Sequence, residues 1–174
     1  MKWFQAGLRL FRVGLETFGA VSLICIALFV LRPSSDRLNA ASRKDVLSVL
    51  KWAEISTNQD FKILGSYQSS RSFTGDYFDY YCIELSRFDI PDHGEVHLWN
   101  DGPERNQLLI EALDTGVNQA RSLGNCFPST GEANSGALKM MFSHVLIDGH
   151  HPSSGEIFLY DPKKQMLYYV GYKT

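Results

Sequence analysis

The sequence predicts an α+β protein in which an N-terminal transmembrane helix precedes a small domain with an antiparallel sheet of about six strands and two helices. Three observations support this fold class. An apolar run lies near the start of the chain, two later segments have apolar residues at helical spacing, and short stretches rich in aromatic and β-branched residues alternate with turn-forming residues. The chain of 174 residues is 44% hydrophobic and 21% charged, which is enough apolar material for one folded domain.

The apolar run, TFGAVSLICIALFVL at residues 17–31, contains no charged residue. As a helix it covers about 22 Å, against a hydrocarbon core about 30 Å thick. Adding residues 13–16, with Glu16 at the interface, brings the run to transmembrane length. We therefore predict that residues 17–32 form a signal-anchor. A cleaved signal peptide and a helix buried in the core of the domain are the alternatives.

Residues 1–16 are predicted to form an amphipathic helix in the cytoplasm or at the membrane interface. Large apolar residues recur every three or four positions, and the opposite side carries basic residues. A basic face of this kind binds the headgroups of anionic lipids, so the predicted partner of residues 1–32 is the lipid bilayer. Pro33 stops the helix, and residues 33–41 are therefore predicted to be a linker.

Charge is distributed unevenly along the chain. Residues 1–40 contain five Lys or Arg and two acidic residues, whereas residues 41–174 contain twelve Lys or Arg and seventeen acidic residues. Nucleic-acid binding needs a basic surface that displaces counterions from phosphates, so the acidic body argues against a nucleic-acid partner. Residues 42–174 are instead predicted to form one extracytoplasmic α+β domain.

Cysteine usage indicates where that domain lies. Cys25 is within the apolar run, which leaves Cys82 and Cys126 as a pair in the domain. A disulfide between them would contribute roughly 4 kcal/mol in the chain-entropy model, and such bonds persist in oxidising compartments. We therefore predict a single-pass protein of the inner membrane, with its N-terminus in the cytoplasm and its domain outside. Two buried free thiols are the alternative.

The first helix of the domain is predicted in residues 42–55. Ser42 can cap its N-terminus, and Asp45 follows three positions later. Apolar residues at helical spacing then give the segment one face to bury.

The second helix is predicted at residues 101–124. Asp101 or Gly102 can cap its start, and Pro103 has the fixed φ angle that suits the first helical position. Gly124 can take the left-handed conformation that ends many helices.

Strands are predicted where the helical spacing gives way to runs of aromatic and β-branched residues between turn signals. The last two of them form a hairpin, since Asp161 and Pro162 suit turn positions. The expected arrangement is an antiparallel sheet with both helices against one face. The predicted strands are residues 61–67, 73–85, 95–99, 138–147, 155–161 and 165–172.

Two adjacent histidines, His150 and His151, lie between two predicted strands on a loop of about eight residues. Neighbouring side chains on an extended loop point apart, so the pair is poorly suited to hold one tetrahedral ion. His97 and His144, both in predicted strands, could complete a metal site with one of them. The sequence lacks the H-E-x-x-H and C-x-x-C patterns, which favours a solvated loop over a metal site, and no cofactor is predicted.

No catalytic residue is predicted either. The sequence lacks the G-x-S-x-G pattern of serine hydrolases. The acidic pair Asp76 and Asp79 is interpreted as turn and surface residues rather than as a glycosidase dyad, since such pairs are common among seventeen acidic residues.

Six tyrosines are the remaining candidates for a partner-binding surface. An exposed tyrosine anchors protein partners well, because its ring is apolar and its hydroxyl polar. Ordinary packing within the sheet is the simpler explanation of the same residues. The candidates are Tyr77, Tyr80, Tyr81, Tyr168, Tyr169 and Tyr172.

These observations support three functional hypotheses. The first is a non-catalytic envelope module that binds a protein partner through an aromatic sheet face or through residues 124–137 and 148–155. The second is a membrane-tethered hydrolase or metal-dependent enzyme that uses the histidines. The third is a cleaved, exported inhibitor or immunity-type protein.

Overall fold

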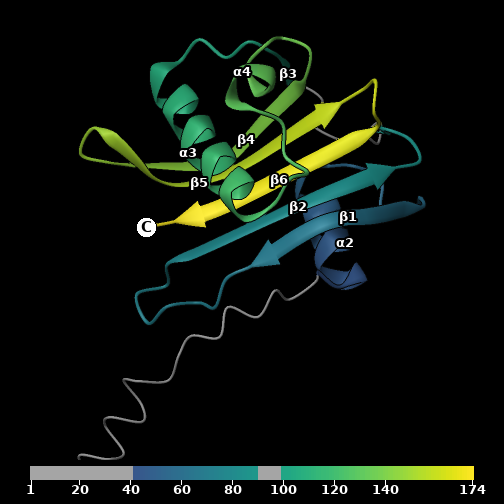
Figure 1. Ribbon diagram of the computed structural model, residues 1–174, viewed down its shortest axis with the longest axis horizontal. Coiled ribbons are helices and arrows are strands. Elements are labelled where there is room, and N and C mark those ends of the chain that lie inside the picture. Colours follow the sequence, from purple (N-terminus) through teal and green to yellow (C-terminus); the bar gives the residue numbers. More distant parts are fainter. Residues whose placement is uncertain (1–40, 90–98) are drawn as a thin grey trace, which may run out of the picture. The chain divides into compact units, whose positions relative to one another are not determined.

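The computed structural model describes residues 41–89 and 99–174, which form a six-stranded sheet with helices on both sides (Figure 1). All neighbouring strands are antiparallel, in the order β1-β2-β6-β5-β4-β3. The predicted antiparallel sheet of an α+β domain is confirmed. The strands are β1 (Phe61–Gln68), β2 (Tyr77–Leu85), β3 (Asn100–Asp101), β4 (Lys139–Asp148), β5 (His151–Asp161) and β6 (Met166–Lys173).

The two main helices, α2 (Arg43–Trp52) and α3 (Gln107–Leu123), cover opposite faces of the sheet. Alternate residues of each strand point to opposite faces, so the central strands contribute to two separate cores. One core packs under α3 and the other under α2. The expectation that both helices lie against one face was wrong, because both faces of β2, β5 and β6 carry large apolar residues that need a cover.

The start of α2 agrees with the sequence. Ser42 is the N-cap, and its hydroxyl accepts a hydrogen bond from the Asp45 backbone N–H at 3.3 Å. The Asp45 carboxylate accepts in turn from the Ser42 backbone N–H at 2.8 Å, which completes a capping box. The cap fixes where α2 begins.

The ends of α3 differ from the prediction. The N-cap is Asn106, whose side chain accepts from the Leu108 N–H at 3.0 Å, so Pro103 lies before the helix. The Glu104 carboxylate accepts from the next two backbone N–H groups and makes a separate turn there. Gly124 has an extended backbone rather than a left-handed one, and a Cβ at this position would collide with Tyr80. Position 124 therefore requires glycine, because the Tyr80 side chain occupies the place of a Cβ.

The predicted disulfide between Cys82 and Cys126 is present. Cys82 is fully buried on β2, and Cys126 follows the end of α3, so the bond attaches the helix to the sheet. Gly65, at an irregularity of the β1–β2 pairing, leaves the space that the bond occupies. A Cβ on Gly65 would lie 2.8 Å from the Cys126 sulfur.

The hairpins at the end of the domain are longer than expected. β5 and β6 form the predicted hairpin, in which Asp161 accepts from the Lys163 backbone N–H. β4 and β5 extend as far as Asp148 and His151, so the predicted loop of eight residues is replaced by a tight turn. Gly149 has a φ of 63° at its first position, which glycine adopts at little cost.

Other predictions concern residues outside the described ranges. The predicted strand 95–99 falls almost entirely on residues 90–98, and the segments predicted at the membrane fall on residues 1–40. Within the described residues, no helix is long and apolar enough to span a bilayer.

Candidate functional site

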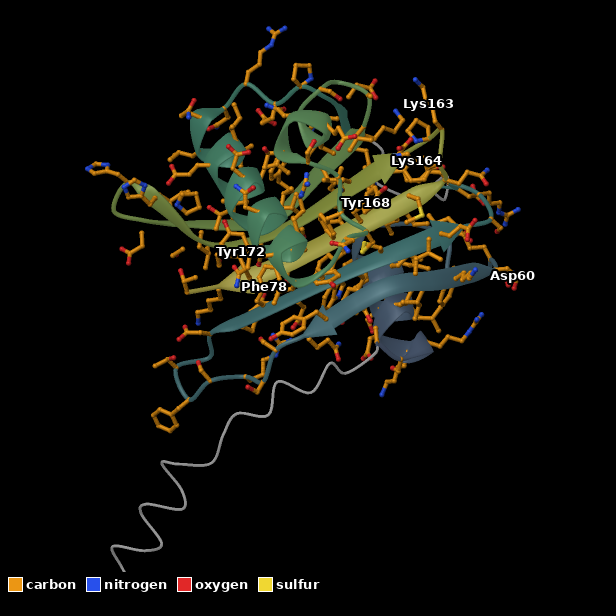
Figure 2. All side chains as sticks on the ribbon, viewed as in Figure 1. Asp60, Phe78, Lys163, Lys164, Tyr168 and Tyr172 are labelled. Carbon is orange, nitrogen blue, oxygen red and sulfur yellow. A yellow bond between two sulfur atoms is a disulfide. The ribbon has the colours of Figure 1, made fainter. Side chains whose placement is uncertain are left out.

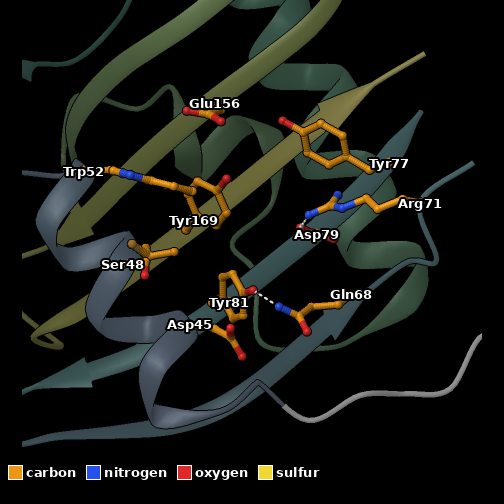
Figure 3. Close-up of a pocket in the computed structure, with 11 residues that line it drawn as sticks. Asp45, Ser48, Trp52, Gln68, Arg71, Tyr77, Asp79, Tyr81, Glu156 and Tyr169 are labelled. Atoms are coloured by element: carbon orange, nitrogen blue, oxygen red, sulfur yellow. Dashed lines mark hydrogen bonds and ion pairs between the residues drawn. The ribbon is translucent and has the colours of Figure 1, made fainter. Parts of the chain in front are cut away.

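A cavity of about 220 Å³ opens beside α2, over the part of the sheet that this helix leaves uncovered (Figure 3). Its floor comes from β2, β5 and β6, and its walls come from α2, the end of β1 and the connection that follows β1. α2 contributes one face, because residues three, four and seven positions apart project to the same side of a helix. These are Asp45, Ser48, Val49 and Trp52.

A line of polar residues crosses the floor from strand to strand. The pairing aligns Asp79 on β2 with Gly171 on β6, and Gly171 with Glu156 on β5. Gln68 on β1 continues the line on one side and His144 on β4 on the other. We call these five residues, Gln68, Asp79, Gly171, Glu156 and His144, the polar row. Gly171 has no side chain, and the Tyr169 hydroxyl lies over it, between the two carboxylates of the row.

Arg71, in the connection between β1 and β2, reaches over the polar row. Its Nη2 lies 2.7 Å from Oδ2 of Asp79, and its guanidinium carbon lies 4.1 Å from the centre of the Tyr77 ring. The Arg71 side chain is 57% exposed, whereas that of Asp79 is 6% exposed. Arg71 therefore contacts both solvent and a buried carboxylate.

The second oxygen of that carboxylate is unsatisfied. Oδ1 of Asp79 is buried and has no hydrogen-bond partner among the described residues. Burial raises the pKa of Asp79, although the positive charge of Arg71 acts in the opposite direction. A buried carboxylate oxygen without a donor is costly. Because Oδ1 is itself closed to solvent, a donor from outside the chain reaches it only when a neighbouring side chain moves.

Three tyrosine rings complete the floor. Tyr81 and Tyr169 stack with ring centres 5.5 Å apart, and the Gln68 amide donates a hydrogen bond to the Tyr81 hydroxyl. Burial raises the pKa of Tyr81 to about 12. The pKa of Tyr77 is raised first by burial and then by the negative charge of Glu156. Both hydroxyls are therefore protonated at neutral pH and can donate hydrogen bonds.

The six tyrosines proposed from the sequence divide between the two faces. Tyr77, Tyr81 and Tyr169 line the cavity, whereas the other three lie in the core under α3. Figure 2 labels two of the latter, Tyr168 and Tyr172. Core packing, which the sequence analysis preferred, describes that second group and also Tyr81 and Tyr169, which are each 3% exposed in the core under α2. The residues under α3 are Tyr80, Tyr168 and Tyr172.

The predicted histidines do not form one cluster. His144 is exposed, with Nδ1 3.5 Å from Oε2 of Glu156, and His151 lies 2.7 Å from Glu111 on α3. His150 occupies the turn between β4 and β5, and His97 lies outside the described residues. Residues 41–89 and 99–174 contain no group of three His, Cys, Asp or Glu residues placed to hold a metal ion.

Sequence reasoning missed most of the cavity. Asp79 was interpreted as a turn or surface residue, but only 4% of it is exposed. The available signal was its position in β2, where it shares a face with two tyrosines. Arg71 and Glu156 gave no such signal. Arg71 reaches the cavity from the connection between β1 and β2, and Glu156 reaches it through the pairing of β5 with β6 and of β6 with the distant β2.

Comparison with known proteins does not place the chain in a family. No family model matches it, and no curated protein and no solved structure matches it significantly. The geometry of the cavity is therefore the basis for a functional proposal.

Proposed function

We propose that this chain is a non-catalytic binding module, held at the outer face of the inner membrane by its N-terminal segment, whose cavity takes up a side chain of a protein partner. One observation carries the proposal. Asp79 is a buried carboxylate with one oxygen unsatisfied by any described residue, and it lines a cavity that is open to solvent. Natural proteins satisfy such groups, so a ligand is the expected donor.

The composition of the cavity suits recognition. Binding sites combine apolar and aromatic area with a few polar groups that fix orientation. Here Trp52, Tyr77 and Tyr169 supply the area. Three members of the polar row, Gln68, Asp79 and Glu156, supply polar groups. Trp52 is 52% exposed at the rim, where an aromatic residue is a frequent contact in protein interfaces.

The size of the cavity favours a side chain over a larger free ligand. Pockets for drug-sized molecules measure about 300–1,000 Å³. The cavity, at about 220 Å³, is smaller and has an open mouth. A single side chain presented by a protein surface fits this volume, while the exposed rim contacts the surface around it.

The membrane location rests on the sequence and on the disulfide. The uncharged run at residues 17–31 supports an anchor, and the Cys82–Cys126 bond supports an oxidising compartment for the domain. To test the location, cells producing the full chain are treated with a thiol reagent before and after reduction. We expect full-length protein in the membrane fraction with Cys82 and Cys126 protected until reduction. Soluble full-length protein with reactive thiols would contradict the proposed location.

The binding role is tested by site-specific photo-crosslinking in cells. A photoreactive phenylalanine analogue replaces Trp52 at the rim of the cavity or, as a matched control, Leu123 on α3, which is 42% exposed on the opposite face. We expect a discrete adduct with another protein from position 52 and none from position 123. Equal adducts from both positions, or none from position 52, would reject the cavity as the binding site.

A further inference from the structure

We infer that the group bound in the cavity is a cation, the guanidinium or ammonium group of an arginine or lysine side chain on the partner. The inference rests on the proposed function and specifies its ligand. It follows from the arrangement of charges, from the two carboxylates that flank the cavity and from the position that Arg71 already occupies.

The charges that line the cavity favour a cation. Among the described lining residues, the carboxylates of Asp45, Asp79 and Glu156 stand against the single guanidinium of Arg71. An anionic ligand would face this negative excess in a partly buried space, where charges are less screened than in bulk water. A cationic ligand would reduce this negative excess.

The two carboxylates of the polar row flank the cavity. Gly171 separates Asp79 from Glu156 on three adjacent strands, and adjacent strands lie about 4.8 Å apart, so the two residues are roughly 10 Å apart. The Tyr169 hydroxyl lies over Gly171 between them. A guanidinium has donors on opposite edges of a plane, so in the cavity above Tyr169 it can donate toward both carboxylates.

Arg71 shows that the cavity accepts a guanidinium. It forms an ion pair with Asp79 and lies over the Tyr77 ring, which is the geometry of a cation–π contact. One Asp79 oxygen nevertheless stays without a donor among the described residues. Arg71 belongs to a connection rather than to a strand, so its side chain can leave without loss of sheet hydrogen bonds. A second cation beside the same carboxylate is repelled by the charge of Arg71, so Arg71 and the ligand compete for Asp79.

A peptide titration tests the charge of the ligand. The full-length chain, in a non-ionic detergent, is titrated with N-acetyl-Gly-Arg-Gly-amide while the indole N–H resonance of Trp52 is followed by NMR. Parallel titrations use the same peptide with citrulline, lysine or glutamate in place of the arginine. Citrulline has nearly the shape of arginine without its charge. We expect saturation by the arginine and lysine peptides, and an affinity for citrulline lower by roughly tenfold or more.

Three variants locate the binding. Glu156→Gln should weaken binding of the arginine peptide roughly three- to tenfold. Glu84→Gln, the same change at an exposed site on β2, should leave that binding unchanged. Arg71→Ala should strengthen it, because the internal competitor is gone. Near-ultraviolet circular dichroism checks that each variant keeps its fold.

The outcomes separate this inference from the proposed function. Three results would each overturn the inference that the ligand is a cation. They are equal binding of the citrulline peptide, preferential binding of the glutamate peptide, and weaker binding of the arginine peptide by Arg71→Ala. A failure of the arginine peptide to saturate would overturn it too. In all four cases the adduct at position 52 decides independently whether the cavity binds a protein.

Discussion

Asp79 is the residue that most distinguishes this domain from a simple packed sheet. It lies near the start of β2 between Phe78 and Tyr80, which point into the opposite core. Arg71 neutralises part of its charge, but the ion pair satisfies one carboxylate oxygen only. An ion pair with one buried partner contributes little net stability, because desolvation of the Asp79 carboxylate offsets the attraction.

The replacement Asp79→Asn should change how stability depends on pH. Burial raises the pKa of Asp79 above its ordinary value of 3.8, so the folded state binds the proton more tightly than the unfolded state. Ionisation then costs stability as the pH rises from the unfolded pKa through the folded one. We expect the free energy of unfolding of the variant, minus that of the wild type, to increase between pH 3 and pH 7 in urea titrations. A decrease would mean that Arg71 outweighs burial.

At the scale of elements, α2 acts as the wall of the cavity. It has ten residues, and its N-terminus is held by the capping box of Ser42 and Asp45. Its other end is held by the Trp99 indole, which donates to the Ala53 carbonyl at 3.0 Å. A helix this short has little stability of its own and depends on its caps and on the core beneath it.

Removal of the N-cap should therefore destabilise α2. Ser42→Ala deletes the hydroxyl that accepts from the Asp45 N–H, and we expect the free energy of unfolding to fall by roughly 1 kcal/mol. Ser48→Ala is the matched control, because the Ser48 hydroxyl donates to the Lys44 carbonyl within the same helix. Its effect should stay within roughly 0.5 kcal/mol in urea unfolding. Equal losses in both variants would argue against the capping box as the determinant.

The sequence predicted elements better than their arrangement. Local signals were sufficient for the cap of α2, for the β5–β6 hairpin and for the cysteine pair. The opposite placement of α2 and α3 could not be read in this way, because an amphipathic helix does not specify which face of a sheet it covers. The polar row depends on the registers of β5 with β6 and of β6 with β2, and the second of these pairings joins segments far apart in the chain.

At the scale of the whole domain, the sheet separates two cores that are both rich in tyrosine. Tyr81 is buried on the α2 side and Tyr172 on the α3 side. Burial raises the pKa of each hydroxyl to about 12. Ionisation at high pH therefore acts on both cores at once.

Alkaline conditions should consequently unfold the domain. The folded pKa of Tyr81 and Tyr172 lies above the unfolded value of 10, so stability is retained below pH 10 and lost as the pH rises toward 12. We expect phenolate absorbance from the buried tyrosines to appear together with loss of far-ultraviolet circular dichroism. Ionisation of all eight tyrosines near pH 10 with intact circular dichroism would contradict this.

The position of β6 in the sheet also sets the order in which the domain can assemble. β6 lies between β2 and β5, and its pairing joins Tyr77 to Lys173 and Glu84 to Met166. Until Met166–Lys173 is available, β1–β2 and β3–β4–β5 are separate sheets with unpaired edges. Contacts this distant in sequence make folding slow, and unpaired apolar edges associate with other chains. A chain that emerges from its N-terminal end thus exposes the edge of β2 until β6 follows, and association with other chains is favoured during that interval.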